Sequence, residues 1–120
     1  MKKIDSHGFL GCGFTCELVL PDNLTYIGDI AFGYSNNLYG SLNFPDKLTY
    51  LGAEAFRGCG NLSGNIEIPQ NITDIKFATF EGAPLRGTLK LHDGIKSIGA
   101  GAFNMCGLRG ELNLPKDLVV

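Results

Sequence analysis

The sequence predicts a β-rich solenoid, in which short parallel strands stack in about five turns of 23 to 24 residues. Short helical or irregular arcs should complete each turn on the side away from these strands. Two observations favour this class: a motif that recurs at a fixed interval, and an excess of turn-forming residues, with 17 glycines and 5 prolines among 120 residues. The composition, 44% hydrophobic and 18% charged, fits one domain without long solvated helices.

The repeat divides the chain into complete turns flanked by a partial turn at each end. The complete turns span residues 17–40, 41–64, 65–87 and 88–110, and the partial turns span residues 1–16 and 111–120. Because both ends stop within a turn and lack a polar cap, we expect a single domain over residues 1–120 that is a fragment of a longer array. An alternative is that the exposed end turns pair between two copies of the chain and form a homodimer.

Two apolar columns, two residues apart, predict a strand in every turn. The first column contains Leu18, Leu42, Ile66, Leu89 and Leu112. The second column contains Leu20, Phe44, Ile68, Leu91 and Leu114. Alternate residues of a strand point to the same face, so both columns should face one core. Proline follows the second column in four of five turns, and His92 replaces it once. Since proline cannot donate to a ladder, each strand should end there.

The remainder of each turn carries three further columns. Aliphatic pairs follow the proline position, at Leu24 with Ile27, Leu48 with Leu51, Ile72 with Ile75, and Ile95 with Ile98. Phenylalanines follow at Phe32, Phe56, Phe80 and Phe103. We expect these rings to stack in the middle of the core. A leucine and then a glycine close each turn, with the glycines at positions 40, 64, 87 and 110, where a Cβ would obstruct the corner.

Read along one turn, these columns give the motif L-x-[LIF]-P-x-x-[LI]-x-x-[IL]-G-x-x-A-F-x-x-C-x-x-L. This motif resembles the BspA-like, or Treponema-type, leucine-rich repeat over nearly the whole chain. In the second turn the matching residues are Leu42, Phe44, Pro45, Leu48, Leu51, Gly52, Ala55, Phe56, Cys59 and Leu62. The third turn departs from the motif at Lys76, Thr79 and Ala83, and the fourth departs at His92. We expect these departures to weaken their turns and to leave the register intact.

The resemblance implies a leucine-rich-repeat fold and a protein of the bacterial or protozoan cell surface, or a secreted one. It also implies a protein partner, on a host, in the matrix or on another cell, and a role in adhesion. These expectations belong to the family and not to any residue of this chain. The first residues, Met-Lys-Lys-Ile-Asp-Ser-His, lack the apolar core of a signal peptide.

Several other classes of protein find no support in the sequence. A net charge of −2 and a pI near 5.6, without a basic stripe, argue against nucleic-acid binding. No apolar run approaches the roughly 20 residues of a membrane span. No nucleophile, base and orienting group recur at a readable spacing, and residues 58–64 lack the spacing of a phosphate-binding loop. The sequence therefore predicts no enzyme, no catalytic residue and no cofactor.

The cysteines, histidines and aspartates have structural interpretations. One column of small residues contains Cys12, Ser35, Cys59, Ala83 and Cys106. Its cysteines are two turns apart, about 9 to 10 Å, which exceeds the roughly 7 Å limit for a disulfide, so we interpret them as core packing. A bond between Cys12 and Cys16 remains a less favoured alternative. The two histidines occupy different columns, and Asp22, Asp46 and Asp93 follow turn preferences, so no metal site is predicted.

The residues between the apolar columns should face outward and are the candidate partner contacts. One outward column contains Glu17, Ser41, Asn65, Thr88 and Glu111. The other contains Val19, Asn43, Glu67, Lys90 and Asn113. We call these two columns the polar strip and predict partner contacts at Glu17, Val19, Asn43, Glu67, Lys90 and Asn113. The strip carries amides and hydroxyls and no single-sign field, so a merely solvated face is the alternative.

Two tyrosines are further candidates. Tyr26 and Tyr50 occupy one column on adjacent turns, where they could anchor a partner or merely cover the core. The leading hypothesis for function is a non-enzymatic protein-binding or adhesion module. The alternatives are a structural spacer or stalk segment with no binding site of its own, and a small self-associating solenoid.

Overall fold

The computed structural model describes residues 3–4, 16–35, 38–108 and 115. Within these residues the chain forms short strands joined by turns, and it forms no helix. The strands are β1 (Lys3–Ile4), β2 (Cys16–Glu17), β3 (Tyr26–Ile27), β4 (Leu38–Ser41), β5 (Tyr50–Leu51), β6 (Leu62–Glu67), β7 (Asp74–Ile75), β8 (Arg86–Lys90) and β9 (Ser97–Ile98). Cys12 and Asn113 lie outside the described residues.

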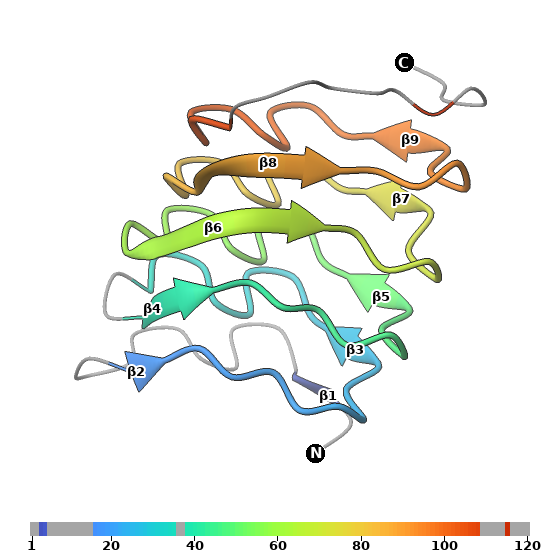
Figure 1. The fold of residues 1–120 in the computed structure, drawn as a ribbon, viewed down its shortest axis with the longest axis horizontal. Helices are drawn as coiled ribbons and strands as arrows, with labels where there is room; N and C mark the ends of the chain where they lie inside the picture. The colour runs from blue at the N-terminus through green and yellow to red at the C-terminus, as the bar shows by residue number, and fades with distance from the viewer. Residues whose placement is uncertain (1–2, 5–15, 36–37, 109–114, 116–120) are drawn as a thin grey trace.

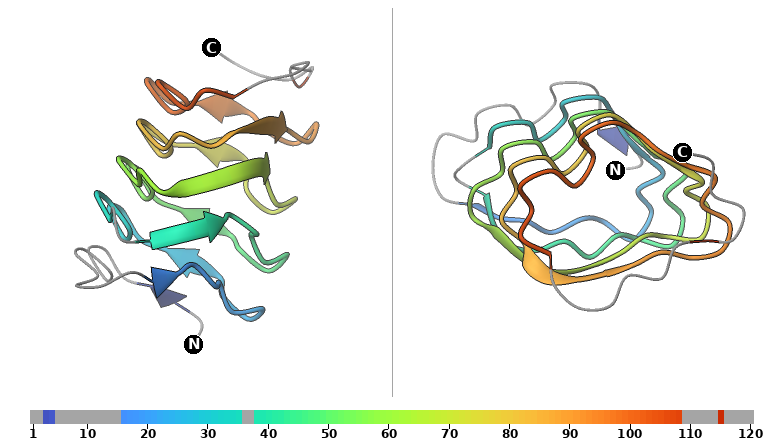
Figure 2. Two further views of the ribbon diagram at one scale, coloured as in Figure 1. Left: turned by 60° about the vertical axis from the view of Figure 1, so that its left-hand side comes forward. Right: turned by 90° about the horizontal axis from the view of Figure 1, so that it is seen from above.

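The turns stack into a solenoid with two ladders of parallel strands (Figure 1). One ladder has the order β2-β4-β6-β8, and the other side of the coil carries β1-β3-β5 and, separately, β7-β9. Every pairing between these strands is parallel. Seen from above, successive turns follow one another around a common centre (Figure 2). This arrangement confirms the predicted solenoid of short parallel strands.

The position of the first ladder differs from the prediction. Strands β2 and β4 end at Glu17 and Ser41, before the apolar columns that were expected to form the strands. Ladder partners at this corner, such as Gly40 and Leu62, are 22 residues apart, although the repeat is 24 residues long there. Farther along these turns, equivalent residues stack 24 positions apart. Strand pairing at a separation of 22 residues cannot continue there. The sequence pattern showed which residues point inward and did not show this offset.

Strand β8 resolves the offset by a bulge. Gly64 pairs with Arg86 across the β6–β8 ladder, but two residues later Ile66 pairs with Leu89, so β8 carries one more residue than β6 between the two pairs. The amide of Thr88, at the bulge, donates to Oδ1 of the Asn65 side chain at 2.8 Å. Pairing then continues to Glu67 and Lys90 in the repeat register. The ladder therefore extends along the apolar columns only between β6 and β8.

The second ladder was not predicted as a strand. It lies at the aliphatic pairs, where Tyr26 of β3 pairs with Tyr50 of β5 in the 24-residue repeat register. A strand of two residues is too short to show an alternating pattern, so the sequence indicated only that this side is apolar. Glycine follows β3, β5 and β9, and the amide of Gly52 donates to the carbonyl of Ile27 at 2.9 Å.

This second ladder is interrupted at Lys76, which takes the place of that glycine after β7. A Cβ placed on Gly52 would lie 2.5 Å from the backbone nitrogen of Asp29, and one on Gly99 would lie 2.6 Å from the nitrogen of Phe77. Where turns pair in this ladder, they approach too closely for any side chain at the glycine position. Among the described strands, β5 and β7 do not pair, and a cleft of about 40 Å³ lies between them. The departure from the motif at Lys76 thus lies where this ladder is interrupted, and the expected weakening of the third turn stays a prediction.

The arcs that carry the phenylalanines are irregular rather than helical. Their amides donate alternately within the turn and to the next turn, as when Ala31 donates to Gly28 at 3.2 Å and Phe32 donates to Ala55 at 2.9 Å. Each arc also contains two residues with left-handed backbone angles, such as Glu54 at a φ of 57° and Gly58 at 71°. A left-handed residue every four positions ends any helix. The bonds to the next turn tie the arcs together.

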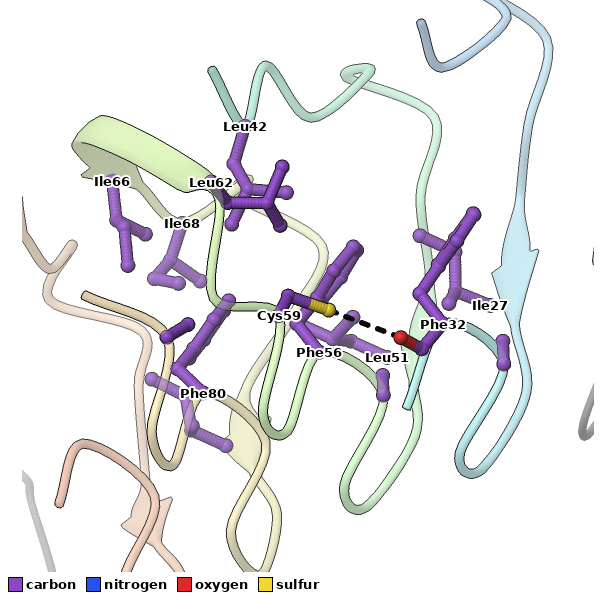
Figure 3. Packing of buried hydrophobic residues seen from close by; sticks show 14 of the residues in the cluster. Ile27, Phe32, Leu42, Leu51, Phe56, Cys59, Leu62, Ile66, Ile68 and Phe80 are labelled. Carbon is purple, nitrogen blue, oxygen red and sulfur yellow. Dashed lines mark hydrogen bonds between the residues drawn. The ribbon is translucent and has the colours of Figure 1, made fainter. Parts of the chain in front are cut away.

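The core is a column of stacked aromatic rings, as predicted. Phe32 and Phe56 stack with centroids 5.1 Å apart, Phe56 and Phe80 at 5.9 Å, and Phe80 and Phe103 at 5.5 Å. Phe44 packs edge-on against Phe56 at 5.9 Å. Figure 3 shows Phe56 between Phe32 and Phe80, with the leucines and isoleucines of the other columns around them. Each turn therefore completes its core only by contact with its neighbours.

Candidate functional site

The polar strip lies on the exposed side of the first ladder. The structure places five of its six predicted contact residues, and all five are exposed: Glu17, Val19, Asn43, Glu67 and Lys90. Val19 is 75% exposed, which is unusual for a valine in a chain with so complete a core. The sixth residue, Asn113, lies outside the described residues. The structure thus brings the predicted residues together on one face that runs across four turns.

This face is hollowed between the turns. One hollow of about 340 Å³ is lined by Glu17, Leu18, Val19, Leu20, Gly40, Ser41 and Asn43. A second hollow of about 300 Å³ is lined by Leu42, Asn43, Phe44, Asp46, Asn65, Glu67 and Pro69. Asn43 lines both hollows, so they adjoin each other. We call the two hollows together the trough.

The offset of the first ladder explains why the trough exists. Strands β2, β4 and β6 pair only at their corner, up to Glu17 with Tyr39 and Ser41 with Ser63. Beyond these pairs the amide of Leu18 still donates to the carbonyl of Tyr39 at 2.9 Å, but residues 19–20 and 42–44 are in no strand and no ladder joins neighbouring turns along them. Leu18 and Leu42 also line the trough, but they are only 8% and 2% exposed because their side chains pack in the core, so the accessible lining is mainly polar. The alternating sequence pattern predicted the polar lining and gave no sign of the hollows.

The charges in the trough have one sign. Glu17 lines the first hollow, and Asp46 and Glu67 line the second, whereas no lysine or arginine lines either of them among the described residues. Lys90 lies beyond the second hollow, with its Nζ 4.0 Å from Oε1 of Glu67. Both side chains of this pair are about three-quarters exposed, at 77% and 73%, so the pairing is weak. The strip as a whole is mixed in charge, but its hollowed part is acidic.

Two amides of the trough differ in their availability. Asn65 is engaged by the bulge of β8, because its Oδ1 accepts the amide of Thr88. Asn43 is exposed and makes no hydrogen bond to the described part of the chain. An amide side chain carries both a donor and an acceptor. Asn43 can therefore offer both to the backbone of a bound peptide.

The two candidate tyrosines lie on the second ladder, apart from the trough. Their rings stack with centroids 4.6 Å apart and an interplanar angle of 12°. Lys76 Nζ lies 5.0 Å from the Tyr50 centroid, and Lys3 Nζ lies 5.8 Å from that of Tyr26. Because each ring has the other ring on one side and an ammonium group near it, little aromatic face is left for a ligand.

Tyr50 is also held by its hydroxyl group. Its Oη donates to Oδ1 of Asp29 at 3.0 Å, and the same oxygen accepts the amide of Ala53 at 3.0 Å. Burial raises the pKa of Tyr50 above its ordinary value, and the hydrogen bond to Asp29 raises it further. These contacts favour the interpretation that the tyrosines cover the core and join adjacent turns.

The cysteine column is a packing column in the described turns. Cys59 and Cys106 are buried free thiols, and their Sγ atoms donate to the carbonyls of Phe32 at 3.0 Å and Phe80 at 2.7 Å (Figure 3 shows the first). Each thiol thus joins its turn to the preceding one. Burial raises the pKa of Cys59 to about 12 and that of Cys106 to about 11. The proposed alternative bond between Cys12 and Cys16 falls outside the described side chains.

These raised pKa values predict slow thiol labelling. In a Cys12→Ser/Cys16→Ser variant at about pH 8, both remaining thiols should react with Ellman's reagent more than about a hundredfold more slowly in the native than in the urea-unfolded protein. A pKa above the ordinary value leaves almost no thiolate at this pH, and burial blocks access. Ser63→Cys on exposed β6, added to the same background, should supply one rapidly reacting thiol. Rapid labelling without this added cysteine would contradict the packing.

An ion-pair cluster on the arcs was missed by the sequence reasoning. Arg57 Nη1 lies 2.7 Å from Oε2 of Glu54, and its Nη2 lies 2.8 Å from Oε1 of Glu81. Asn104 Nδ2 donates to Glu81 at 3.3 Å, and the guanidinium lies 5.9 Å from the ring of Tyr34. The sequence could have indicated this cluster, because Glu54 and Arg57 are three residues apart and Arg57 and Glu81 are one repeat apart. The cluster joins residues of four turns and its charges are paired, so we interpret it as a structural contact between turns.

Two further observations concern metals and membranes. Within the residues that the structure describes, no group of three or more histidines, cysteines, aspartates or glutamates is placed to hold a metal ion. The same part of the chain contains no helix long and apolar enough to cross a membrane.

The fold and the trough define the class of this protein: a repeat solenoid with parallel ladders, a continuous apolar core and one hollowed polar face. The model for the BspA type leucine rich repeat region (6 copies) matches residues 2–119. The chain therefore belongs to the family of BspA-type leucine-rich repeats, as its motif indicated.

Two solved structures are similar to the chain. The crystal structure of a T. pallidum leucine rich repeat protein (TpLRR) aligns with a TM-score of 0.74 and 25% sequence identity, over 89% of this chain and 49% of that one. A leucine-rich repeat protein from Bacteroides ovatus aligns with a TM-score of 0.30 and 20% identity, over 90% of this chain and 51% of that one. The chain thus spans about half the length of these two proteins. No curated protein matches it.

Proposed function

We propose that this chain is a non-enzymatic protein-binding module of a cell-surface or secreted leucine-rich-repeat protein, with a role in adhesion, and that the trough is its contact with a protein partner. Membership in the BspA-type family supports a repeat module that interacts with proteins. A rigid face presented by stacked turns suits that task, because solenoids bind extended surfaces without rearranging.

The observation that carries this proposal is the trough itself. It combines a hollowed surface, exposed carboxylates at Glu17, Asp46 and Glu67, and an available amide at Asn43. Three other polar features have partners within the described chain: the tyrosines stack on each other, the thiols bond to carbonyls, and Arg57 is paired with two carboxylates. A binding face needs unpaired groups around a depression, and the trough supplies them.

Selection from a displayed peptide library tests the proposal. The library is panned on the immobilised chain, and each enriched peptide is then measured against the variant Asn43→Ala/Glu67→Ala/Lys90→Ala. Binding should weaken by about tenfold or more, because these three side chains lie in or beside the trough. The matched control is Gln70→Ala/Asp93→Ala/Lys96→Ala, which removes an exposed amide, acid and lysine elsewhere on the chain. This control should bind as the wild type does.

Two outcomes would contradict the proposal. If no peptide is enriched, or if the enriched peptides bind both variants equally well, the spacer or stalk alternative accounts for the chain better. If the peptides lose binding only to the control variant, the contact face is elsewhere. Circular dichroism of both variants shows whether any loss of binding comes from loss of the fold.

A further inference from the structure

The trough has a charge pattern that specifies a kind of partner. Its carboxylates come from three successive turns: Glu17 before the first hollow, and Asp46 and Glu67 around the second. Neighbouring turns are about 4.8 Å apart at the ladder, so these groups are spread over roughly 10 Å along the stacking direction. They also lie at different positions along their turns and are not gathered at one point. Since they line two different hollows, they suit several separate positive charges better than one metal ion.

We infer that the trough binds an extended peptide segment carrying several lysine or arginine side chains; this inference rests on the proposed function and names the chemistry of its partner. In an extended peptide, alternate side chains point the same way about 7 Å apart, which lies between the roughly 4.8 Å of one turn and the roughly 10 Å of two, so long flexible side chains can reach carboxylates at either separation. A long basic side chain can enter either hollow and bring its charged end to a carboxylate there, and in the first hollow its aliphatic stem can lie against the exposed Val19.

Lys90 and Asn43 limit where a basic peptide can lie along the trough. Lys90 lies just beyond the second hollow, beside Glu67, and would repel a further positive charge there. The basic side chains therefore lie over the turns from Glu17 to Glu67. Asn43, at the junction of the two hollows, has its amide available for the peptide backbone between two basic side chains. Because the carboxylates are exposed, the attraction should be modest and should weaken as salt is added.

The test uses labelled peptides of about ten residues in which serine alternates with lysine, glutamate or glutamine, measured by fluorescence anisotropy with the full 120-residue chain. The lysine peptide should bind, and its dissociation constant should rise several-fold between about 50 and 300 mM salt. The glutamate and glutamine peptides should bind at least about tenfold more weakly.

A pair of charge-matched variants places the binding. Asp46→Asn/Glu67→Gln removes two charges from the trough and should weaken lysine-peptide binding by about tenfold. Asp22→Asn/Asp93→Asn removes two exposed charges from the same chain outside the trough and should change binding less than about twofold. Asp22 and Asp93 occupy the same repeat position as Asp46, so the comparison is closely matched.

Three results would overturn this inference. The first is equal weakening by both variants, which indicates general attraction to an acidic chain. The others are equal binding of the three peptides and no binding of the lysine peptide.

Panning distinguishes failure of this inference from failure of the proposed function. Library peptides without basic residues that still lose affinity for the Asn43→Ala/Glu67→Ala/Lys90→Ala variant would leave the trough as a binding site and refute only its preference for a basic partner.

Discussion

Replacing Phe56 with alanine is expected to lower the free energy of unfolding by about 3 to 5 kcal/mol. Its side chain is fully buried, at 0% exposure, with Phe32 stacked on one face and Phe80 on the other. Phe44 contacts the same ring edge-on. Removal of the ring therefore leaves a cavity in the middle of the stack, and the neighbouring rings cannot close it because each is held in its own turn.

Urea denaturation followed by circular dichroism measures this loss. The control is Phe77→Ala, in the following turn, whose side chain is 51% exposed and should cost less than about 1 kcal/mol. If Phe56→Ala does not fold, Phe56→Leu keeps part of the volume and should still cost more than the control. Equal losses for Phe56→Ala and Phe77→Ala would show that the stack is not the core of the solenoid.

The aromatic stack was predictable because one residue type recurs at one place in each turn. Phe32, Phe56, Phe80 and Phe103 occupy a single column, and repeats place equivalent residues over one another. The same reasoning correctly placed Tyr26 next to Tyr50. It missed the two lysines beside them, since Lys76 stands in the glycine column and therefore seemed only a departure from the motif.

The pattern of apolar columns could not predict the trough, for a different reason. That pattern shows which side chains point outward, and it correctly placed Asn43 and Glu67 on the exposed face. Whether neighbouring turns touch there depends on the ladder register, which is set at the corner by pairs such as Gly40 with Leu62. The bulge beside Gly87 restores pairing in the repeat register between β6 and β8 only. An offset of one or two residues in the pairing leaves the spacing between the apolar residues unchanged, so the sequence pattern does not show it.

The glycine column of the second ladder shows how close the turns come where they do pair. Gly52 donates its amide to Ile27 at 2.9 Å, and Gly99 donates to Ile75 at 2.6 Å. A Cβ on Gly52 would lie within 2.5 to 2.6 Å of the backbone nitrogen and the carboxylate oxygen of Asp29. Backbone atoms cannot move aside as the end of a flexible side chain can. One methyl group at this position must therefore push two turns apart.

Replacing Gly52 with alanine is accordingly expected to cost about 3 kcal/mol, at the upper end of the usual range for overpacking. Lys76→Ala is the matched control, because position 76 is in the same column and already carries a Cβ. That control removes only the ammonium group near Tyr50 and should cost less than about 1 kcal/mol.

Hydrogen exchange provides a second measurement: the amide of residue 52 should exchange faster in Gly52→Ala, because its bond to Ile27 is displaced. Equal stability of the two variants would mean that the turns do not approach this closely. Loss of stability in Gly52→Ala alone would show that glycine at this position is what lets adjacent turns pair, and that Lys76 interrupts the ladder for the same reason.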